Sequence, residues 1–152
     1  MTTHSIREAV SADRDWLADC AIEMAWETEH KRLDPGTVRA GIAAGIADPA
    51  KARYFVAVDG DGAPAGTLML TREWSDWRNG DWWWIQSVYV VPSQRRRGLF
   101  AALYRHAEAL ARATAGVVGL RLYVERDNDA ARSTYAALGM ADAGYDILEA
   151  RL

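Results

Sequence analysis

The strongest constraint on the fold comes from residues 82–112, which place a strand pattern directly before a helix pattern. Residues 82–91 are aromatic and β-branched, and Pro92, which cannot donate to a sheet ladder, ends them. Residues 99–112 carry apolar side chains at helical spacing. We therefore predict a strand and a helix joined by a short loop of arginines and one glycine.

This loop is suited to binding an anion. The first turn of a helix has backbone N–H groups without partners, and together with the helix dipole they favour a phosphate. Gly98 permits a sharp bend, while Arg95, Arg96 and Arg97 add positive charge. The pattern predicts phosphate binding, with a solvated basic patch as the alternative.

Length and composition narrow the class of protein. With 152 residues, half of them apolar and 26% charged, the chain suits one globular domain over residues 1–152. The formal net charge of −3 argues against a nucleic-acid partner. No apolar run is long enough to span a bilayer and no signal-peptide core is present, so we expect no membrane partner.

Cysteine and histidine usage predicts neither disulfides nor metals. The single cysteine, Cys20, excludes an internal disulfide and favours a cytoplasmic location, and its position indicates core packing. The three histidines, His4, His30 and His106, are scattered without metal-ligand spacing, so we expect no metal.

Periodicity predicts an α/β (α+β) chain in which strands and helices alternate in a fixed order. The expected strands are residues 4–10, 53–59, 65–74, 82–91, 116–124 and 143–152, and the expected helices 12–29, 38–48, 99–114 and 129–138. Alternation along 82–91 places Gln86 and Ser87 on opposite faces. An acidic stripe on the first helix is either a solvated face or an attraction for a cationic substrate.

Two segments resemble the GCN5-related N-acetyltransferases (GNAT). Residues 95–100, Arg-Arg-Arg-Gly-Leu-Phe, are similar to the family's acyl-CoA pyrophosphate loop, with Phe100 where a small residue is usual. Residues 128–140, with Asn128, Tyr135 and Gly139, are similar to its second motif. The resemblance covers essentially the whole chain and implies the GNAT fold: a mixed, mostly antiparallel sheet of six to seven strands flanked by four helices. A second copy of the chain could cover the sheet edge as a homodimer.

The resemblance also implies a cosubstrate, acetyl-CoA, and the residues that bind it. Its pantetheine arm would pair with the strand at Val88, Tyr89 and Val90, where unpaired backbone groups can bond amides. The pyrophosphate would reach the loop and helix start at Arg95, Arg96, Arg97, Gly98, Leu99, Phe100 and Ala101. Asn128 would bond the arm, or serve only as a helix cap.

By the same resemblance, Tyr135 is the candidate general acid, because a phenol can protonate a departing thiolate of similar basicity. A half-buried helix tyrosine without a catalytic role is the alternative. Glu27, Glu73 and Glu125 are candidates for a general base by position only, and none is assigned. The acceptor would be an amine on a small molecule or peptide.

Three functions compete at this point. The leading one is transfer of an acetyl group to a primary amine. The second is an acyl-CoA-binding or sensing domain without catalysis, which the absence of an evident base leaves open. The third is an RNA-associated module that uses the arginines and tryptophans as a stacking surface, against which the acidic net charge argues.

Overall fold

The computed structural model describes residues 3–152 as an α+β fold in two compact units, residues 3–122 and 123–152. The first unit contains one five-stranded sheet in the order β1-β2-β3-β4-β5. Its strands are β1 (Ser5–Glu8), β2 (Arg53–Val58), β3 (Pro64–Ser75), β4 (Gly80–Val90) and β5 (Val117–Leu122). The first four strands pair antiparallel, and β4 pairs with β5 in parallel. The expectation of a single domain stays a prediction.

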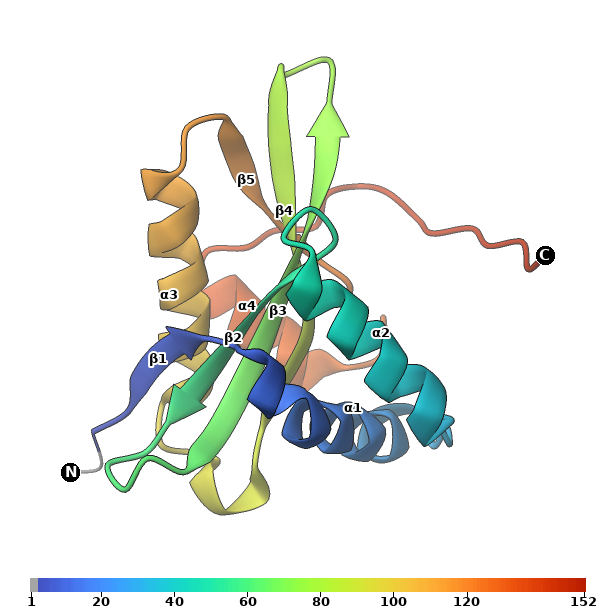
Figure 1. The fold of residues 1–152 in the computed structure, drawn as a ribbon. Coiled ribbons are helices and arrows are strands. Elements are labelled where there is room, and N and C mark those ends of the chain that lie inside the picture. The colour runs from blue at the N-terminus through green and yellow to red at the C-terminus, as the bar shows by residue number, and fades with distance from the viewer. Residues whose placement is uncertain (1–2) are drawn as a thin grey trace. The chain divides into compact units, whose positions relative to one another are not determined.

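Helices cover both faces of this sheet. The helices of the first unit are α1 (Arg14–Glu29), α2 (Pro35–Ala47) and α3 (Leu99–Ala113), with short 3-10 turns η1 (Ser11–Asp13) and η2 (Pro92–Gln94). Leu17 of α1 and Ile42 of α2 pack with Val56 of β2 in one buried cluster. The neighbouring Phe55 instead meets His106 of α3, with ring centroids 5.1 Å apart. Since successive strand residues point to opposite faces, α1 and α2 lie on one face and α3 on the other (Figure 1).

Gly66 of β3 lets α3 approach the sheet closely. A Cβ at this position would lie 3.3 Å from side-chain atoms of both Leu99 and Leu103. These leucines, on the first turns of α3, are 2% and 1% exposed. The start of α3 is therefore held against the sheet by apolar packing.

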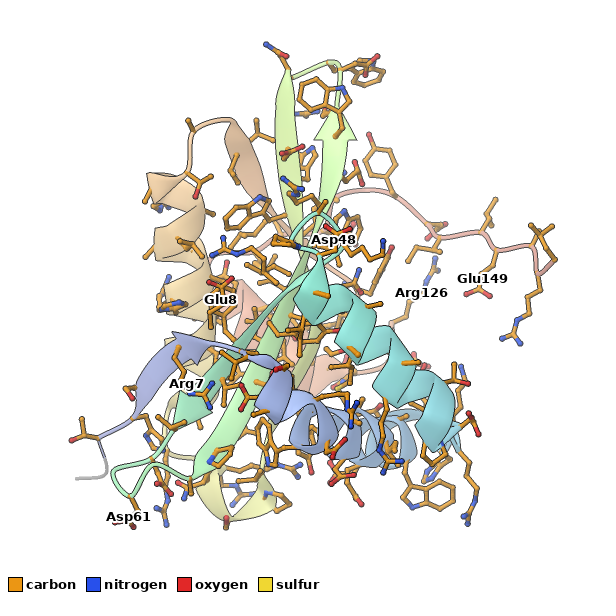
Figure 2. The ribbon with its side chains drawn as sticks, in the orientation of Figure 1. Arg7, Glu8, Asp48, Asp61, Arg126 and Glu149 are labelled. Atoms are coloured by element: carbon orange, nitrogen blue, oxygen red, sulfur yellow. The ribbon has the colours of Figure 1, made fainter. Side chains whose placement is uncertain are left out.

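The start of α1 is held by a buried carboxylate. Asp13 accepts hydrogen bonds from both terminal nitrogens of Arg7 on β1, at 2.8 and 2.9 Å, and from the Val10 amide at 2.8 Å. Figure 2 shows Arg7 and Glu8 on this first strand, close to where the helix begins. These bonds lower the pKa of Asp13, because they stabilise its charged form.

The turn between β2 and β3 is stabilised by an aspartate side chain. Asp59 Oδ1 accepts from the amides of Asp61 and Ala63, both at 2.9 Å, and Asp61 lies at the tip of the turn (Figure 2). Such side-chain bonds to the backbone are the reason why Asp favours turns.

The second unit contains one helix, α4 (Asp129–Ala137), and the sheet has fewer strands than expected. The prediction of six to seven strands is wrong, because within residues 3–152 the structure has five and residues 143–152 form no strand. In that segment Tyr145 is 75% exposed and Leu148 is 94% exposed. Strand-forming side chains alone do not make a strand, since the backbone also needs a partner ladder.

No helix within the described residues is long and apolar enough to cross a membrane.

Candidate active site

The predicted junction joins the end of β4 to the start of α3. Gly98 is the residue before the first turn of α3, and its left-handed conformation (φ 77°) is one that glycine adopts readily. A Cβ there would meet nothing within 4 Å, so glycine is favoured at this position by the backbone conformation and not by lack of space. The loop residues 95–98 are exposed. The helix start thus has the form of an anion site that solvent can reach.

The three arginines of the loop differ in their contacts. Arg95 donates through Nε to the Val90 carbonyl at 2.9 Å and through a terminal nitrogen to Glu27 of α1 at 2.8 Å. Its guanidinium also lies 5.4 Å from the ring centre of Tyr89. Arg95 therefore ties the loop to β4 and α1, whereas Arg96 and Arg97 project from the exposed loop. The phosphate role of all three stays a prediction.

β4 and β5 part before the loop. Their parallel pairing runs from Asp81 with Val117 to Ile85 with Leu122, where β5 ends, while β4 continues to Val90. The Val91 amide bonds Ala65 of β3, and Val90 presents its carbonyl to Arg95 instead. Because backbone groups alternate between the two sides of a strand, Val88 faces the same open side as Val90.

A bulge lies where the strands part. Leu68 pairs with Val88 and Leu70 with Ile85, so β4 has one extra residue at Gln86–Ser87 opposite β3. Gln86 donates to Thr71 Oγ1 at 3.1 Å, and Ser87 lines a pocket together with Thr67. Thr67 and Thr71 are four residues apart on β3, hence on one face, so the prediction that Gln86 and Ser87 face opposite ways is wrong.

The pocket lies between this face of the sheet and the two helices that cover it. Its sheet side consists of Tyr54, Thr67, Ser87 and Tyr89. Its helix side consists of Leu17, Cys20, Ala21 and Met24 from α1 with Val38 and Ile42 from α2. The enclosed space is small, with a volume of about 70 Å³, and it opens to solvent on one side.

The polar atoms in the pocket are neutral hydroxyl and thiol groups. Thr67 Oγ1 donates to the Phe55 carbonyl at 2.9 Å. Burial raises the pKa of the Cys20 thiol to about 12, so the thiol stays protonated and the expectation of core packing is confirmed. Burial also raises the pKa values of Tyr54 and Tyr89.

The same sheet face carries a charged cluster on the other side of the bulge. Glu73 accepts from the Trp84 indole N–H at 3.0 Å and from Arg121 at 3.1 Å. The Arg121 guanidinium lies 3.9 Å from the ring centre of Trp82. The Trp82 ring in turn covers Gly119, where a Cβ would lie 2.4 Å from a ring carbon. We call Glu73, Trp82, Trp84 and Arg121 the outer cluster.

Asn128 and Tyr135 belong to the second unit. Asn128 caps α4, since its side-chain oxygen accepts from the Ala131 amide at 3.1 Å. Tyr135 is half-buried on α4, and burial raises its pKa. The cap is confirmed, while the contact of Asn128 with the pantetheine arm and the acid role of Tyr135 stay predictions. Within residues 3–152 no group of at least three His, Cys, Asp or Glu side chains could hold a metal ion.

Three features of the site escaped the sequence-based reasoning. The bulge contains no glycine or proline that would indicate it. The tie between Arg95 and Glu27 joins residues 68 positions apart. For the outer cluster, the signal that the sequence offers is the density of tryptophans in residues 74–84.

The model of the acetyltransferase (GNAT) family matches residues 13–140 of this chain. Among solved structures, a possible acetyltransferase from Clostridium difficile 630 is 38% identical, with a TM-score of 0.93, covering 98% of this chain and 97% of that one. A probable acetyltransferase is 21% identical with a TM-score of 0.85, covering 97% of each chain.

A more distant structure shows the same fold. The ribosomal-protein-alanine N-acetyltransferase from Brucella melitensis biovar Abortus 2308 is 17% identical with a TM-score of 0.76, covering 99% of this chain and 100% of that one. No curated protein matches the sequence.

Proposed function

The chain belongs to the acetyltransferase (GNAT) family, and on this premise we propose that it transfers an acetyl group from acetyl-CoA to a primary amine. The observation that carries the proposal is the junction of β4 and α3. Gly98, left-handed and exposed, caps the start of α3, and a short loop joins it to β4, which has parted from its parallel neighbour. A diphosphate can thus bind at the helix start while an amide-containing arm extends along the open side of β4.

We assign the binding of acetyl-CoA to the chain's backbone and to two arginines. The amides of residues 98–101 would donate to the diphosphate, and Arg96 and Arg97 would add charge-assisted bonds. The backbone carbonyl of Val88 would accept a hydrogen bond from an amide of the pantetheine arm, because it faces the side that β5 has left. Arg95 would hold the loop in place through its bonds to Val90 and Glu27.

In the reaction the amine nitrogen forms a bond to the acetyl carbonyl carbon, the carbon–sulfur bond breaks, and the amine loses a proton. The Val88 amide would polarise the carbonyl as a hydrogen-bond donor. Tyr135 would give its phenolic proton to the departing thiolate. Burial raises the pKa of Tyr135, so the phenol carries this proton at neutral pH.

Of the three carboxylates proposed by position, two have charged or hydrogen-bonding partners and the third is exposed. Glu27 pairs with Arg95 at 2.8 Å, and Glu73 is bonded by Trp84 and Arg121. Glu125 lies exposed in the second unit. We therefore assign none of them as the general base, and water or a neutral amine would account for the lost proton.

The engagement of these carboxylates favours one alternative, an acyl-CoA-binding domain without catalysis. An assay of free thiol release from acetyl-CoA, run with a panel of primary amines, separates the two functions. Amine-dependent thiol release with an acetylated product supports the enzyme. Tight acetyl-CoA binding by calorimetry without thiol release from any amine of the panel supports the binding domain.

A further inference from the structure

The bulge of β4 divides the sheet face on which α1 and α2 pack into two regions of different chemistry. On one side lies the pocket, and none of its lining side chains is charged. On the other side lies the outer cluster, with the carboxylate of Glu73 and the guanidinium of Arg121. Ser87, at the bulge, lines the pocket and is next in sequence to Val88, which faces the open edge of β4.

The lining of the pocket selects a neutral, apolar occupant. A buried ammonium group without a charged partner would pay a large desolvation cost. Cys20 and the phenols of Tyr54 and Tyr89 stay neutral because burial raises their pKa values. Thr67 already donates its hydroxyl proton to Phe55. Methylene groups, in contrast, would exchange water for the apolar surface of Ala21 and Met24.

The outer cluster offers the polar surroundings that the pocket lacks. Glu73 and Arg121 both keep solvent contact, with side-chain exposures of 44% and 21%. A polar acceptor approaching the thioester across this cluster would keep its hydrogen bonds, whereas inside the pocket it would lose them. The pocket is therefore available for the acyl chain, which is attached to the thioester carbonyl on the side away from the sulfur.

We propose that the pocket between α1, α2 and the bulge of β4 receives the acyl chain of the thioester. The protein would then accept unbranched propionyl and butyryl thioesters as well as acetyl thioesters. This inference rests on the proposed function, because it places the thioester beside Val88. It goes further by naming the acyl class. The transfer step is unchanged, with the carbon–sulfur bond replaced by a carbon–nitrogen bond.

The test compares kcat/KM for acetyl-CoA, propionyl-CoA and butyryl-CoA with one amine. For the wild-type chain we expect butyryl-CoA to be used with a kcat/KM of at least about a tenth of that for acetyl-CoA. Ala21→Leu should fill the pocket and lower the butyryl-to-acetyl ratio of kcat/KM by about tenfold or more. Both residues are good helix formers, so the variant should still form α1. Met24→Ala should enlarge the pocket and raise the ratio.

Ala40→Leu is the matched control, because Ala40 lies exposed on α2 and does not line the pocket. It should leave the ratio as in the wild type. Far-UV circular dichroism and thermal unfolding of each variant show whether it folds. Because the readout is a ratio of two substrates for the same preparation, partial loss of folded protein does not change it.

Several results would overturn the inference. One is a wild-type chain that uses acetyl-CoA but not propionyl-CoA or butyryl-CoA. Another is an Ala21→Leu variant that changes the preference within a series of alkylamines and not within the acyl series, which would assign the pocket to the acceptor. If no thioester releases thiol, the proposed function fails separately. Calorimetric affinities then decide, and equal effects of Ala21→Leu on acetyl-CoA and butyryl-CoA binding would sink the pocket assignment too.

Discussion

The outer half of β4, from Asp81 to Ile85, lies between β3 and β5, whereas the inner half, from the bulge at Gln86–Ser87 to Val90, borders β3 alone among the strands of the sheet. In the outer half, the Trp83 side chain is buried (4% exposed), and the Trp84 indole N–H donates to the charged Glu73. The inner half borders a neutral pocket and leads into the arginine loop. We therefore propose that one half of the strand stabilises the sheet while the other half contacts the ligand, with the bulge at Gln86–Ser87 between them.

The largest expected effect is on the rate of the proposed acetyl transfer. Tyr135→Phe should lower kcat by about 10²–10⁴-fold, because the departing thiolate loses its proton donor, while acetyl-CoA affinity stays nearly unchanged. Since burial raises the pKa of Tyr135, the wild-type rate should lose this contribution only as pH rises through that raised pKa. Single-turnover rates with calorimetry measure both quantities.

Tyr145→Phe is the control for this change, since Tyr145 lies in the same unit and is 75% exposed. It should keep the wild-type rate. A Tyr135→Phe variant with an unaltered rate, under conditions where chemistry limits turnover, would remove Tyr135 from the reaction.

The outer half should be the more sensitive to loss of a large side chain. Trp83→Ala should lower the free energy of unfolding by about 3–5 kcal/mol, because it empties a buried site against the sheet. Trp74→Ala, at a position 61% exposed on the neighbouring strand, should cost less than about 1 kcal/mol. Urea denaturation measures both, and equal costs would contradict the structural role of the outer half.

The pocket depends on α1, and α1 begins at the buried carboxylate of Asp13. Asp13→Asn should lower the free energy of unfolding by about 1–3 kcal/mol at neutral pH, because an amide cannot accept both bonds from Arg7. The folded-state pKa of Asp13 is lowered, so this contribution is complete above its unfolded pKa near ~4 and disappears as pH falls through the folded value. A difference between variant and wild type that persists at low pH would contradict this assignment.

The smallest expected effect concerns two left-handed glycines. Gly98→Ala and Gly62→Ala should each lower the free energy of unfolding by about 1–2 kcal/mol, since both have positive φ and open space around them. Gly98→Ala should in addition weaken acetyl-CoA binding by about tenfold, because it disturbs the amides at the helix start. Equal acetyl-CoA affinities of the two variants would show that Gly98 does not contribute to the phosphate site.

The sequence predicted those parts of the molecule that local patterns determine. The strand, the arginine loop and the start of α3 follow from Pro92, Gly98 and the helical spacing after Leu99, and the structure places each as expected. The bulge was not predictable, because it results from the register of β4 against β3 and requires no special residue. Arg95 was expected at a phosphate, and its tie to Glu27 depends on how α1 packs. Residues 143–152 have strand-like composition, but pairing decides whether a strand forms.

The most direct test of the central claim is a crystal structure of the chain with CoA bound. The account predicts diphosphate oxygens within hydrogen-bond distance, roughly 2.7–3.2 Å, of backbone amides in residues 98–101, with the pantetheine arm beside Val88. A diphosphate bound elsewhere, or an arm that does not follow the open side of β4, would contradict it.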